Sequence, residues 1–374
     1  MTQNKEVRWV PLGEIIRQRR EKFSGELLPI RGVSREGFIP PKQKEADYSK
    51  YNVFYFNDFV FNPARMELNS IALNTELEKG ICSSLYEIFF ITDEKFLPSY
   101  VNIFIKRDEF ARHCEYIGSG SAREYCRVAN ISELKIPVPY KEGEPDVDRQ
   151  QEIVDVWQGL RRLKEENEAL AKPLMELCDA KMDELKHSAP MVELGNFIEQ
   201  RDERNKDNKY NLDNLQGVSI DKKFIPTKAN MEGVKLTPYK LVYPFDFCYV
   251  NITSRNGEKI TLALNQSNQD YIVSSSYIVF RVTKKNDLDP TFLYLWFCRS
   301  EFDRYSRFNS WGSAREAFSW EEMCLVKVPK PSLEVQKAIV DIYHCARRAK
   351  EIAAEADKQL KEICPALMQH IIHS

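Results

Sequence analysis

Cationic side chains recur at matching places in the two halves of this sequence. Guanidinium and ammonium groups contact phosphate oxygens, and arginine and asparagine side chains can also read guanine and adenine edges in a major groove. A single charge is more often a solvated surface residue, but recurrence in both halves favours a phosphate-contacting face. The candidate nucleic-acid-binding residues are Arg17, Arg19, Arg20, Lys22, Arg65, Arg107, Arg123, Arg201, Arg204, Arg255, Asn256, Lys259, Arg299 and Arg315.

The two halves differ in charge and in loop chemistry at two places. Residues 17–22 carry four cations in six residues, whereas acids interleave with the cations of residues 201–209. Residues 250–262 include a polar loop with a glycine, an arginine and an asparagine, whereas their shorter counterpart, residues 62–70, has a different chemistry. If both halves bind nucleic acid, we expect their specificities to differ at these places.

The motifs of several enzyme classes are missing from the sequence. It contains no Gly-x-x-x-x-Gly-Lys-Ser/Thr phosphate loop, no Gly-x-Gly-x-x-Gly after a strand and no Gly-x-Ser-x-Gly elbow. Asn62-Pro63 begins like the motif of amino methyltransferases, but Ala64-Arg65 lacks the aromatic residue that stacks a flipped base. The five histidines form no metal-binding pattern. We therefore predict no catalytic residue, no metal ligand and no enzymatic activity for the chain by itself.

A five-residue signature, Gly-Ser-Ala-Arg-Glu, occurs at 120–124 and again at 312–316. Further blocks match between the halves: Leu12-Gly13 with Leu194-Gly195, Gln18-Arg19 with Gln200-Arg201, Ile39-Pro40 with Ile225-Pro226, Asp58-Phe59 with Asp246-Phe247, and residues 135–139 with 327–331. The offset between matching residues drifts from 182 to 192, as a diverged tandem duplication with loop insertions would leave it. The duplication predicts two similar folded units, and therefore two similar binding or reaction sites.

Each half begins with a mixed region of roughly 140 residues and ends in a long, charged helical region. Strand-like runs rich in β-branched and aromatic residues lie at 53–56, 86–91, 241–243 and 277–282. Helical patterns lie at about 98–114 and 290–307. A Pro-x-Pro pair ends each mixed region, because proline removes a backbone donor and disfavours helix in the residue before it.

Apolar residues of the two helical regions recur every three or four positions, which is the a/d pattern of a coiled coil. The first predicted seam is Ile153, Val156, Leu160, Leu163, Asn167, Leu170, Leu174 and Leu177, and the second is Val335, Ile339, Ile342, Ala346, Ala349, Ala353, Ala356, Leu360, Ile363 and Leu367. Pro173 and Pro365 should kink or end these helices. A helix of about 35–40 residues is about 50–60 Å long and would overhang a domain of this size. We therefore favour an antiparallel pair over two independent surface helices.

Composition places the chain among ordinary globular proteins. Its 374 residues are 43% hydrophobic and 29% charged, and they exceed what one compact core usually holds. No apolar run approaches the ~20 residues of a membrane span, and the N-terminus lacks the apolar stretch of a signal peptide. Nine cysteines without a Cys-x-x-Cys pair favour free thiols in a reducing cytoplasm. The formal net charge of −2 counts against nucleic-acid binding by bulk electrostatics alone.

The layout resembles that of the DNA-specificity subunits of type I restriction-modification systems over essentially the full chain. Residues 135–154, with Lys-Ile-Pro-Val-Pro followed by Gln150 and Ile153-Val154, are similar to the family's boundary between recognition domain and conserved helix. Residues 327–340, with Gln336 and Ile339-Val340, are similar to that boundary a second time. The strand at 274–280 and the Gly-Ser-Ala-Arg segments are also similar to family patterns.

The resemblance implies an α+β fold with an internal pseudo-twofold repeat. Two similar mixed α/β target-recognition domains would be separated by two long helices that form an antiparallel coiled-coil spacer. The expected boundaries are 1–147 for the first target-recognition domain, 148–189 for the central spacer helix, 190–332 for the second domain and 333–374 for the C-terminal spacer helix. Each domain would read one half of a split, asymmetric DNA site, and the spacer would set the distance between the half-sites.

The resemblance also implies partners. These are double-stranded DNA and two methyltransferase (modification) subunits, with restriction (helicase-nuclease) subunits as optional further partners, and no membrane. In this family the specificity subunit contributes no catalytic residue, so S-adenosylmethionine, ATP and Mg²⁺ would be bound by the partner subunits and not by this chain. Ten acidic against seven basic residues in 148–187 make the first long helix a better protein-docking surface than DNA ligand.

Two other functions stay open on the sequence. A stand-alone DNA-modifying enzyme is disfavoured by the missing motifs. A coiled-coil scaffold that only assembles protein partners predicts no sequence preference in selection from random DNA, whereas a specificity subunit predicts a bipartite motif with a fixed gap.

Overall fold

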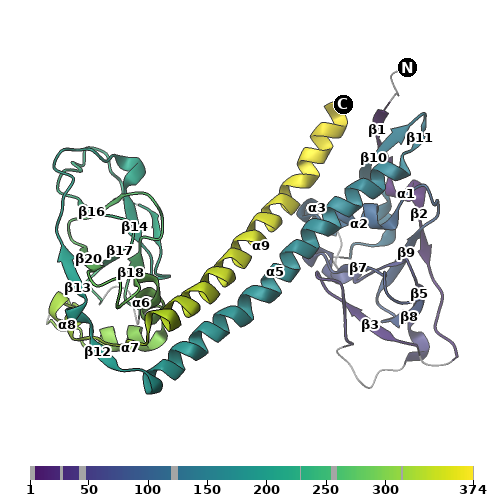
Figure 1. Cartoon of the computed structure of the whole chain (residues 1–374). Coiled ribbons are helices and arrows are strands. Elements are labelled where there is room, and N and C mark those ends of the chain that lie inside the picture. The colour runs from purple at the N-terminus through teal and green to yellow at the C-terminus, as the bar shows by residue number, and fades with distance from the viewer. Residues whose placement is uncertain are drawn as a thin grey trace. The chain divides into compact units, whose positions relative to one another are not determined.

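The structure is a computed structural model that describes residues 5–25, 28–41, 48–118, 125–227, 229–253, 259–312 and 315–373 (Figure 1). The chain divides into two compact units. The first contains residues 1–166 and 352–374, and the second contains residues 167–351. Each unit therefore has one mixed α/β region and a stretch of both long helices.

The mixed region of the first unit is built from short strands and short helices. Its strands are β1 (Lys5–Pro11), β2 (Ile16–Arg19), β3 (Ile30–Val33), β4 (Phe38–Ile39), β5 (Asn52–Tyr55), β6 (Phe59–Phe61), β7 (Ile71–Leu73), β8 (Lys79–Cys82), β9 (Glu87–Ile91), β10 (Lys135–Lys141) and β11 (Glu144–Pro145). Its helices are α1 (Leu12–Ile15), η1 (Tyr48–Lys50), η2 (Pro63–Leu68), α2 (Pro98–Ile105), α3 (Asp108–Gly118) and α4 (Val128–Ser132), where η marks a 3₁₀ helix.

The mixed region of the second unit repeats the order of the first ten strands, while its 3₁₀ helices differ. Its strands are β12 (Met191–Glu193), β13 (Ile198–Arg201), β14 (Gln216–Val218), β15 (Phe224–Pro226), β16 (Lys240–Val242), β17 (Asp246–Tyr249), β18 (Leu262–Leu264), β19 (Tyr271–Val273), β20 (Ile278–Val282) and β21 (Lys327–Pro329). Its helices are η3 (Leu194–Asn196), η4 (Leu212–Asn214), α6 (Pro290–Phe297), α7 (Ser300–Phe308) and α8 (Trp320–Leu325).

The central sheet has the same strand order in both units. It is β2-β9-β6-β7 in the first unit and β13-β20-β17-β18 in the second, and neighbouring strands are antiparallel throughout. One aromatic pair occupies the same place in both sheets: the rings of Phe59 and Phe89 stack at 4.8 Å, as do those of Phe247 and Phe280. All four rings are fully buried in the two main cores. The predicted duplication is therefore confirmed in topology and in core packing.

A smaller layer of strands differs more between the units. In the first unit β4-β3-β8-β5 form one sheet, in which β3 and β8 are parallel. In the second unit β14-β15 and β16-β19 form two pairs, and a parallel bridge between Leu215 and Ile272 links the two pairs. Each layer contains a hairpin, β3–β4 or β14–β15, with its turn at residues 34–37 or 219–223.

In each unit, the glycine of the matched Leu-Gly block lies close to a short helix, α4 in the first unit and α8 in the second. A Cβ atom on Gly13 would lie 3.0 Å from the Cβ atom of Ser132 in α4. On Gly195 it would lie 2.9 Å from the Cβ atom of Cys324 in α8. Glycine is therefore needed in both units for the same steric reason.

The helical patterns predicted at 98–114 and 290–307 each contain two helices, α2 with α3 and α6 with α7. Both first helices begin at a proline, which suits the first helical turn. For α6, the side chain of Asp289 caps the start by accepting hydrogen bonds from the backbone N–H groups of Thr291 and Phe292 at 2.7 and 3.0 Å. An arginine, Arg107 or Arg299, lies at the break between the two helices of each pair.

A buried glutamine fastens each long helix to a mixed region. The side chain of Gln150 in α5 (Val147–Ser188) accepts a hydrogen bond from the N–H of Leu97 at 3.0 Å. It also donates a hydrogen bond to the carbonyl oxygen of Lys95 at 2.9 Å. Gln336 of α9 (Leu333–His373) makes the same pair of contacts with residues 287–289, both at 2.8 Å. Both side chains are fully buried, so these bonds are shielded from water.

The long helices pack against each other within each unit. In the second unit, α5 leads into β12, and β21 leads into α9. Because β12 and β21 are antiparallel, α5 runs into this unit and α9 runs out of it. Cys178 Sγ lies 3.8 Å from the carbonyl oxygen of Ile339 there. In the first unit, Lys164 Nζ pairs with Asp357 at 2.6 Å. No helix in the described part of the chain is long and apolar enough to cross a membrane.

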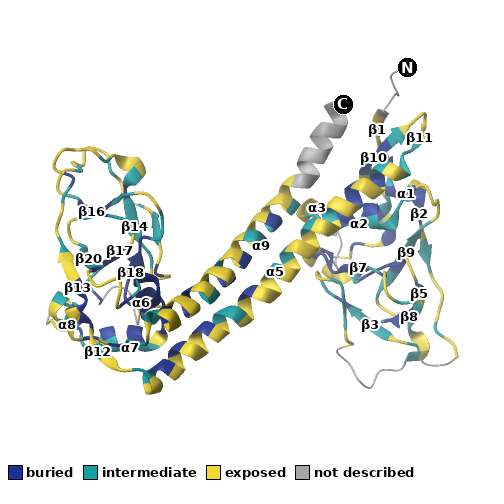
Figure 2. Cartoon of the chain, in the orientation of Figure 1, coloured by how far each residue is buried: buried dark blue, intermediate teal, exposed yellow. Residues whose placement is uncertain are grey.

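The contact line of α5 differs from the predicted seam. Four predicted seam residues, Val156, Leu163, Leu170 and Leu177, are 42–50% exposed. The residues that directly follow Leu170 and Leu177 in the sequence, Ala171 and Cys178, are buried instead. Because two paired helices touch along one line, this line passes through the smaller side chains. The four central alanines of the predicted α9 seam, Ala346, Ala349, Ala353 and Ala356, are all buried, whereas Val335 of the same predicted seam is 41% exposed. Figure 2 draws the buried residues of α9 in dark blue. Pro173 does not end α5, which continues to Ser188.

Candidate nucleic-acid interface

Arg19 holds the buried carboxylate of Asp58 in the first unit. Its Nε and Nη2 atoms donate to the two carboxylate oxygens at 2.6 and 3.0 Å. The guanidinium also lies over the rings of Tyr55 and Phe90, at 4.7 and 4.5 Å from their centroids. Burial raises the pKa of Asp58, although the hydrogen bonds from Arg19 act in the opposite direction. This predicted site residue therefore has a bidentate internal partner.

The second unit contains the same clamp, but its arginine comes from another strand. Arg281 of β20 donates to the two oxygens of Asp246 at 3.0 Å each. The position that matches Arg19 is Arg201 of β13, which pairs with Glu199 at 3.2 Å and with Glu203. Sequence analysis did not select Arg281, because its counterpart in the first half is a phenylalanine and no repeated block marks it.

Cations of the first unit gather around an open cavity of about 410 Å³. Arg19, Arg20 and Lys22 line it together with Arg127, which sequence analysis missed. Arg20 donates to Gln18 at 2.7 and 2.9 Å and stays exposed. The side chain of Arg127 is 65% exposed, although it lies 3.6 Å from Glu87. This concave surface therefore presents several cations to solvent.

The neighbouring cations of this segment make local contacts. Lys22 Nζ donates to Asn52 Oδ1 at 2.7 Å, and the exposed side chain of Arg17 donates to carbonyl oxygens of its own segment. An exposed cation with only such weak local partners can exchange them for a phosphate at small cost.

The matching surface of the second unit is largely neutralised. Asp202 lies 3.0 Å from Arg204 and 3.1 Å from Lys240, which occupies the position of Asn52. The hydrogen bond from Lys240 holds the pKa of Asp202 below its usual range. The acid-rich segment 201–209 therefore differs from 17–22 in the way that its sequence predicted.

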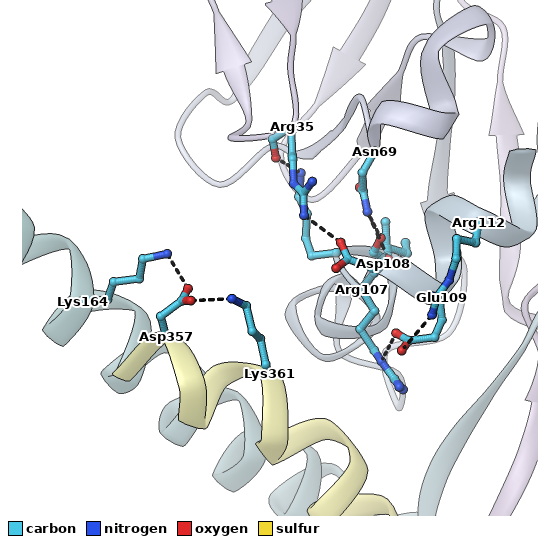
Figure 3. Close-up of polar contacts among 11 residues, drawn as sticks. Arg35, Asn69, Arg107, Asp108, Glu109, Arg112, Lys164, Asp357 and Lys361 are labelled. Carbon is cyan, nitrogen blue, oxygen red and sulfur yellow. Dashed lines mark hydrogen bonds and ion pairs between the residues drawn. The ribbon is translucent and has the colours of Figure 1, made fainter. Parts of the chain in front are cut away.

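Arg107 and Arg299, at equivalent helix breaks, differ in burial. Arg107 Nε pairs with Glu109 at 3.1 Å (Figure 3). Arg299 is only 7% exposed, stacks on Trp296 at 4.8 Å and pairs with Glu301 at 2.9 Å and with Asp183 of α5. A hydrogen bond from Lys186 lowers the pKa of Glu301 to about 2.

The remaining described candidates, Arg65, Lys259 and Arg315, are exposed. Arg65 of η2 lines an open cavity of about 540 Å³ together with Arg31 and Arg35, which sequence analysis also missed. The described candidates belong to two units, and within each unit they come from several loops and strands.

Arg123, Arg255 and Asn256 lie outside the described residues, as do residues 119–124 and 313–314 of the two signature segments. Among the residues that are described, no group of three or more histidine, cysteine, aspartate or glutamate side chains could hold a metal ion.

A comparison with protein families identifies the second half of the chain. Residues 191–362 match the model of the type I restriction modification DNA specificity domain. This region is similar to a type I restriction-modification DNA specificity domain. The match includes the whole second mixed region and most of α9, and the resemblance drawn from the sequence is confirmed there.

Two solved structures are similar to this chain over nearly its full length. The S subunit of a type I restriction-modification system from M. genitalium is 14% identical, with a TM-score of 0.53, over 96% of this chain and 96% of that chain. The HsdS subunit from Thermoanaerobacter tengcongensis is 18% identical, with a TM-score of 0.44, over 98% of this chain and 97% of that chain. The first likeness confirms the predicted fold class. No curated protein sequence matches the chain.

Proposed function

We propose that this chain is a non-catalytic specificity subunit that recognises a bipartite, asymmetric DNA site and directs methyltransferase subunits to it. The observation that carries the proposal is a repeated scaffold with divergent surface charge. Both units have the same central sheet and the same aspartate–arginine clamp. At matching positions, however, Arg20 of the first unit is replaced by Asp202, which neutralises its neighbours. Two similar frames with different surfaces suit two different half-sites.

The proposal keeps the boundaries expected from the sequence. Residues 1–147 and 190–332 would be the target-recognition domains, and residues 148–189 and 333–374 would be the spacer helices. In the first domain, Arg20, Lys22 and Arg127 around the 410 Å³ cavity are exposed candidates for phosphate contacts. In the second domain the exposed candidates are Lys259 and Arg315.

The remaining chemistry belongs to the partners in this proposal. Methyltransferase subunits would bind S-adenosylmethionine, and restriction subunits, where present, would bind ATP and Mg²⁺. The exposed apolar residues Val156 and Leu170 of α5 offer these subunits a docking surface. The complex would work in the cytoplasm, where the free cysteines of this chain stay reduced.

The proposal is tested by reconstituting the chain with its methyltransferase subunits and S-adenosylmethionine, and then sequencing the DNA that is methylated in a random library. We expect a motif of two unlike half-sites separated by a fixed gap. Methylation without sequence preference would support a protein-only scaffold instead. Methyl transfer or cleavage by the chain alone would show that it is an enzyme and would contradict the proposal.

A further inference from the structure

A buried ion pair joins three segments of the second unit. Lys222 lies in the hairpin turn 219–223 with a left-handed backbone (φ +60°), and it is 6% exposed. Its Nζ atom lies 2.5 Å from Asp303 Oδ1 of α7 and 3.3 Å from the carbonyl oxygen of Ile260. The same carboxylate oxygen accepts from the N–H of Ile260 at 3.2 Å. The pair therefore connects the hairpin turn, the segment that leads into β18, and the helical layer.

The turn is held to the helical layer by a second bond. The hydroxyl of Tyr294 in α6 donates to the carbonyl oxygen of Lys222 at 3.0 Å. Turn 219–223 is therefore fixed through both the side chain and the backbone of one residue.

The first unit joins the same three segments with a different lysine. Lys106, at the end of α2, donates to the carbonyl oxygen of Arg35 in turn 34–37 at 2.7 Å and to that of Ile71, which begins β7, at 2.5 Å. Arg35 also pairs with Asp108 of α3 at 2.7 Å, and Asn69 Nδ2 donates to the carbonyl oxygen at the end of α2 at 2.9 Å (Figure 3). Partial burial lowers the pKa of Lys106 to about 8.

The two junctions do not descend from one shared pair. The matched blocks place Lys222 opposite Glu36, Lys106 opposite Cys298, and Asp303 opposite Ala111. The bridging lysine thus comes from the turn in one unit and from the helix in the other. A buried charge is costly, and well-packed apolar residues often stabilise a fold as well as a buried ion pair does. A lysine nevertheless bridges the same junction in both units, through an ion pair in the second and through carbonyl oxygens in the first, which points to a requirement for position.

The junctions leave the hairpin tips exposed. In turn 219–223, Lys222 is buried while Ile220, Asp221 and Lys223 are exposed. Lys259, next to the clamped Ile260, is also exposed. In turn 34–37 the side chain of Arg35 is 62% exposed. Each junction therefore holds an exposed hairpin tip and the approach to an edge strand in one fixed arrangement.

We propose that the Lys222–Asp303 pair is a positioning device for a DNA-contacting surface made of turn 219–223 and Lys259, and that Lys106 does the same for turn 34–37. These residues of the two junctions would determine half-site specificity without touching DNA. The inference rests on the proposed function, and it adds the two hairpin tips to the predicted contact surface.

The test uses the reconstituted methyltransferase complex and sequencing of methylated random DNA, with four variants of the full chain. Lys222→Met removes the junction in the second unit, and Lys106→Met removes it in the first. Lys222→Arg keeps the charge. Lys95→Met is the matched control, because Lys95 pairs with Glu144 on the exposed surface of the first unit. Circular dichroism and thermal unfolding establish that each variant is folded.

We expect Lys222→Met to lower base discrimination in one half-site at least about fivefold, which is the size of one lost base-pair preference. The other half-site and the gap should not change. Lys106→Met should loosen the opposite half-site, Lys222→Arg should restore most of the discrimination, and Lys95→Met should alter neither.

Unchanged half-sites in folded Lys222→Met and Lys106→Met complexes would overturn the inference, as would equal loosening of both half-sites by either variant. If Lys222→Met does not fold, Asp303→Asn decides by the same criterion, and Lys222→Arg remains the charge-preserving control. A wild-type complex without a bipartite motif would instead contradict the proposed function, so the two failures are distinguishable.

Discussion

Most of the predicted cationic candidates that the structure describes have partners within the protein. Arg19 holds Asp58, Arg204 pairs with Asp202, and Arg299 is buried against Trp296. Such side chains organise the surface around them. Exposed cations with weak local contacts, such as Arg20 and Arg127, have more freedom to contact a phosphate.

Glu301 should make the second unit sensitive to acid. Its pKa is lowered to about 2 in the folded unit, chiefly by the hydrogen bond from Lys186. A carboxylate with a lowered folded pKa contributes stability above its ordinary pKa near 4.5, and this contribution is lost as the pH falls from there towards 2. Glu301→Gln should therefore reduce the loss of thermal stability between pH 4.5 and 2. The exposed Glu334→Gln is the control, and an equal effect of both variants would contradict the assignment.

Helices and strands are joined by a few buried polar contacts that recur in both units. Gln150 and Gln336 make equivalent bonds to equivalent loops, and Gly13 and Gly195 admit equivalent helices. These contacts explain why the matched blocks of the sequence have kept their residues while the loops between them differ.

Removal of Gln336 should loosen the joint between α9 and α6. Gln336→Ala leaves the N–H of Asp289 and the carbonyl oxygens of Asp287 and Pro331 without this partner. Buried groups of this kind cost about 1–3 kcal/mol each, so we expect the unfolding free energy of the second unit to fall by about 3 kcal/mol. Native-state hydrogen exchange of α6 amides measures the change. The control is Lys337→Ala, because Lys337 is the exposed neighbour of Gln336. Equal protection of the α6 amides from exchange in the two variants would contradict the prediction.

The whole molecule combines a repeated frame with two long helices that extend from one unit into the other. If these helices are the spacer of the proposed function, their length sets the gap between half-sites. One heptad of helix is about 10 Å long, and seven residues bring the helix back to almost the same face.

Deletion of one heptad from each long helix, residues 168–174 and 345–351, should therefore shorten the gap by about two to three base pairs. Both half-sites should still be read, because neither mixed region is altered. Sequencing of methylated random DNA measures the gap and the half-sites together. A constant gap with a changed half-site would show that the helices do not act as the spacer.

Local patterns in the sequence predicted most of the fold. The strand-like runs at 53–56 and 277–282, the paired helical patterns and the alanine seam of α9 all occur as expected, because periodicity and β-branching act over a few residues. The seam of α5 was only partly right. Ala171 and Cys178 fit the contact line better than the larger leucines beside them, and only the partner helix could decide this.

The sequence by itself determined the duplication, the two long helices and the resemblance to the specificity domain, because these depend on residue order and short-range spacing. Only the tertiary structure decided which charges are available. In the second unit, Arg281 binds the buried aspartate in place of the residue that matches Arg19, and it does so from a neighbouring strand. At the hairpin junction, the bridging lysine is Lys222 of the turn in one unit and Lys106 at the end of a helix in the other. Side chains distant in sequence can exchange such roles without leaving a repeated motif, since the energy of a buried charge depends on its neighbours in space.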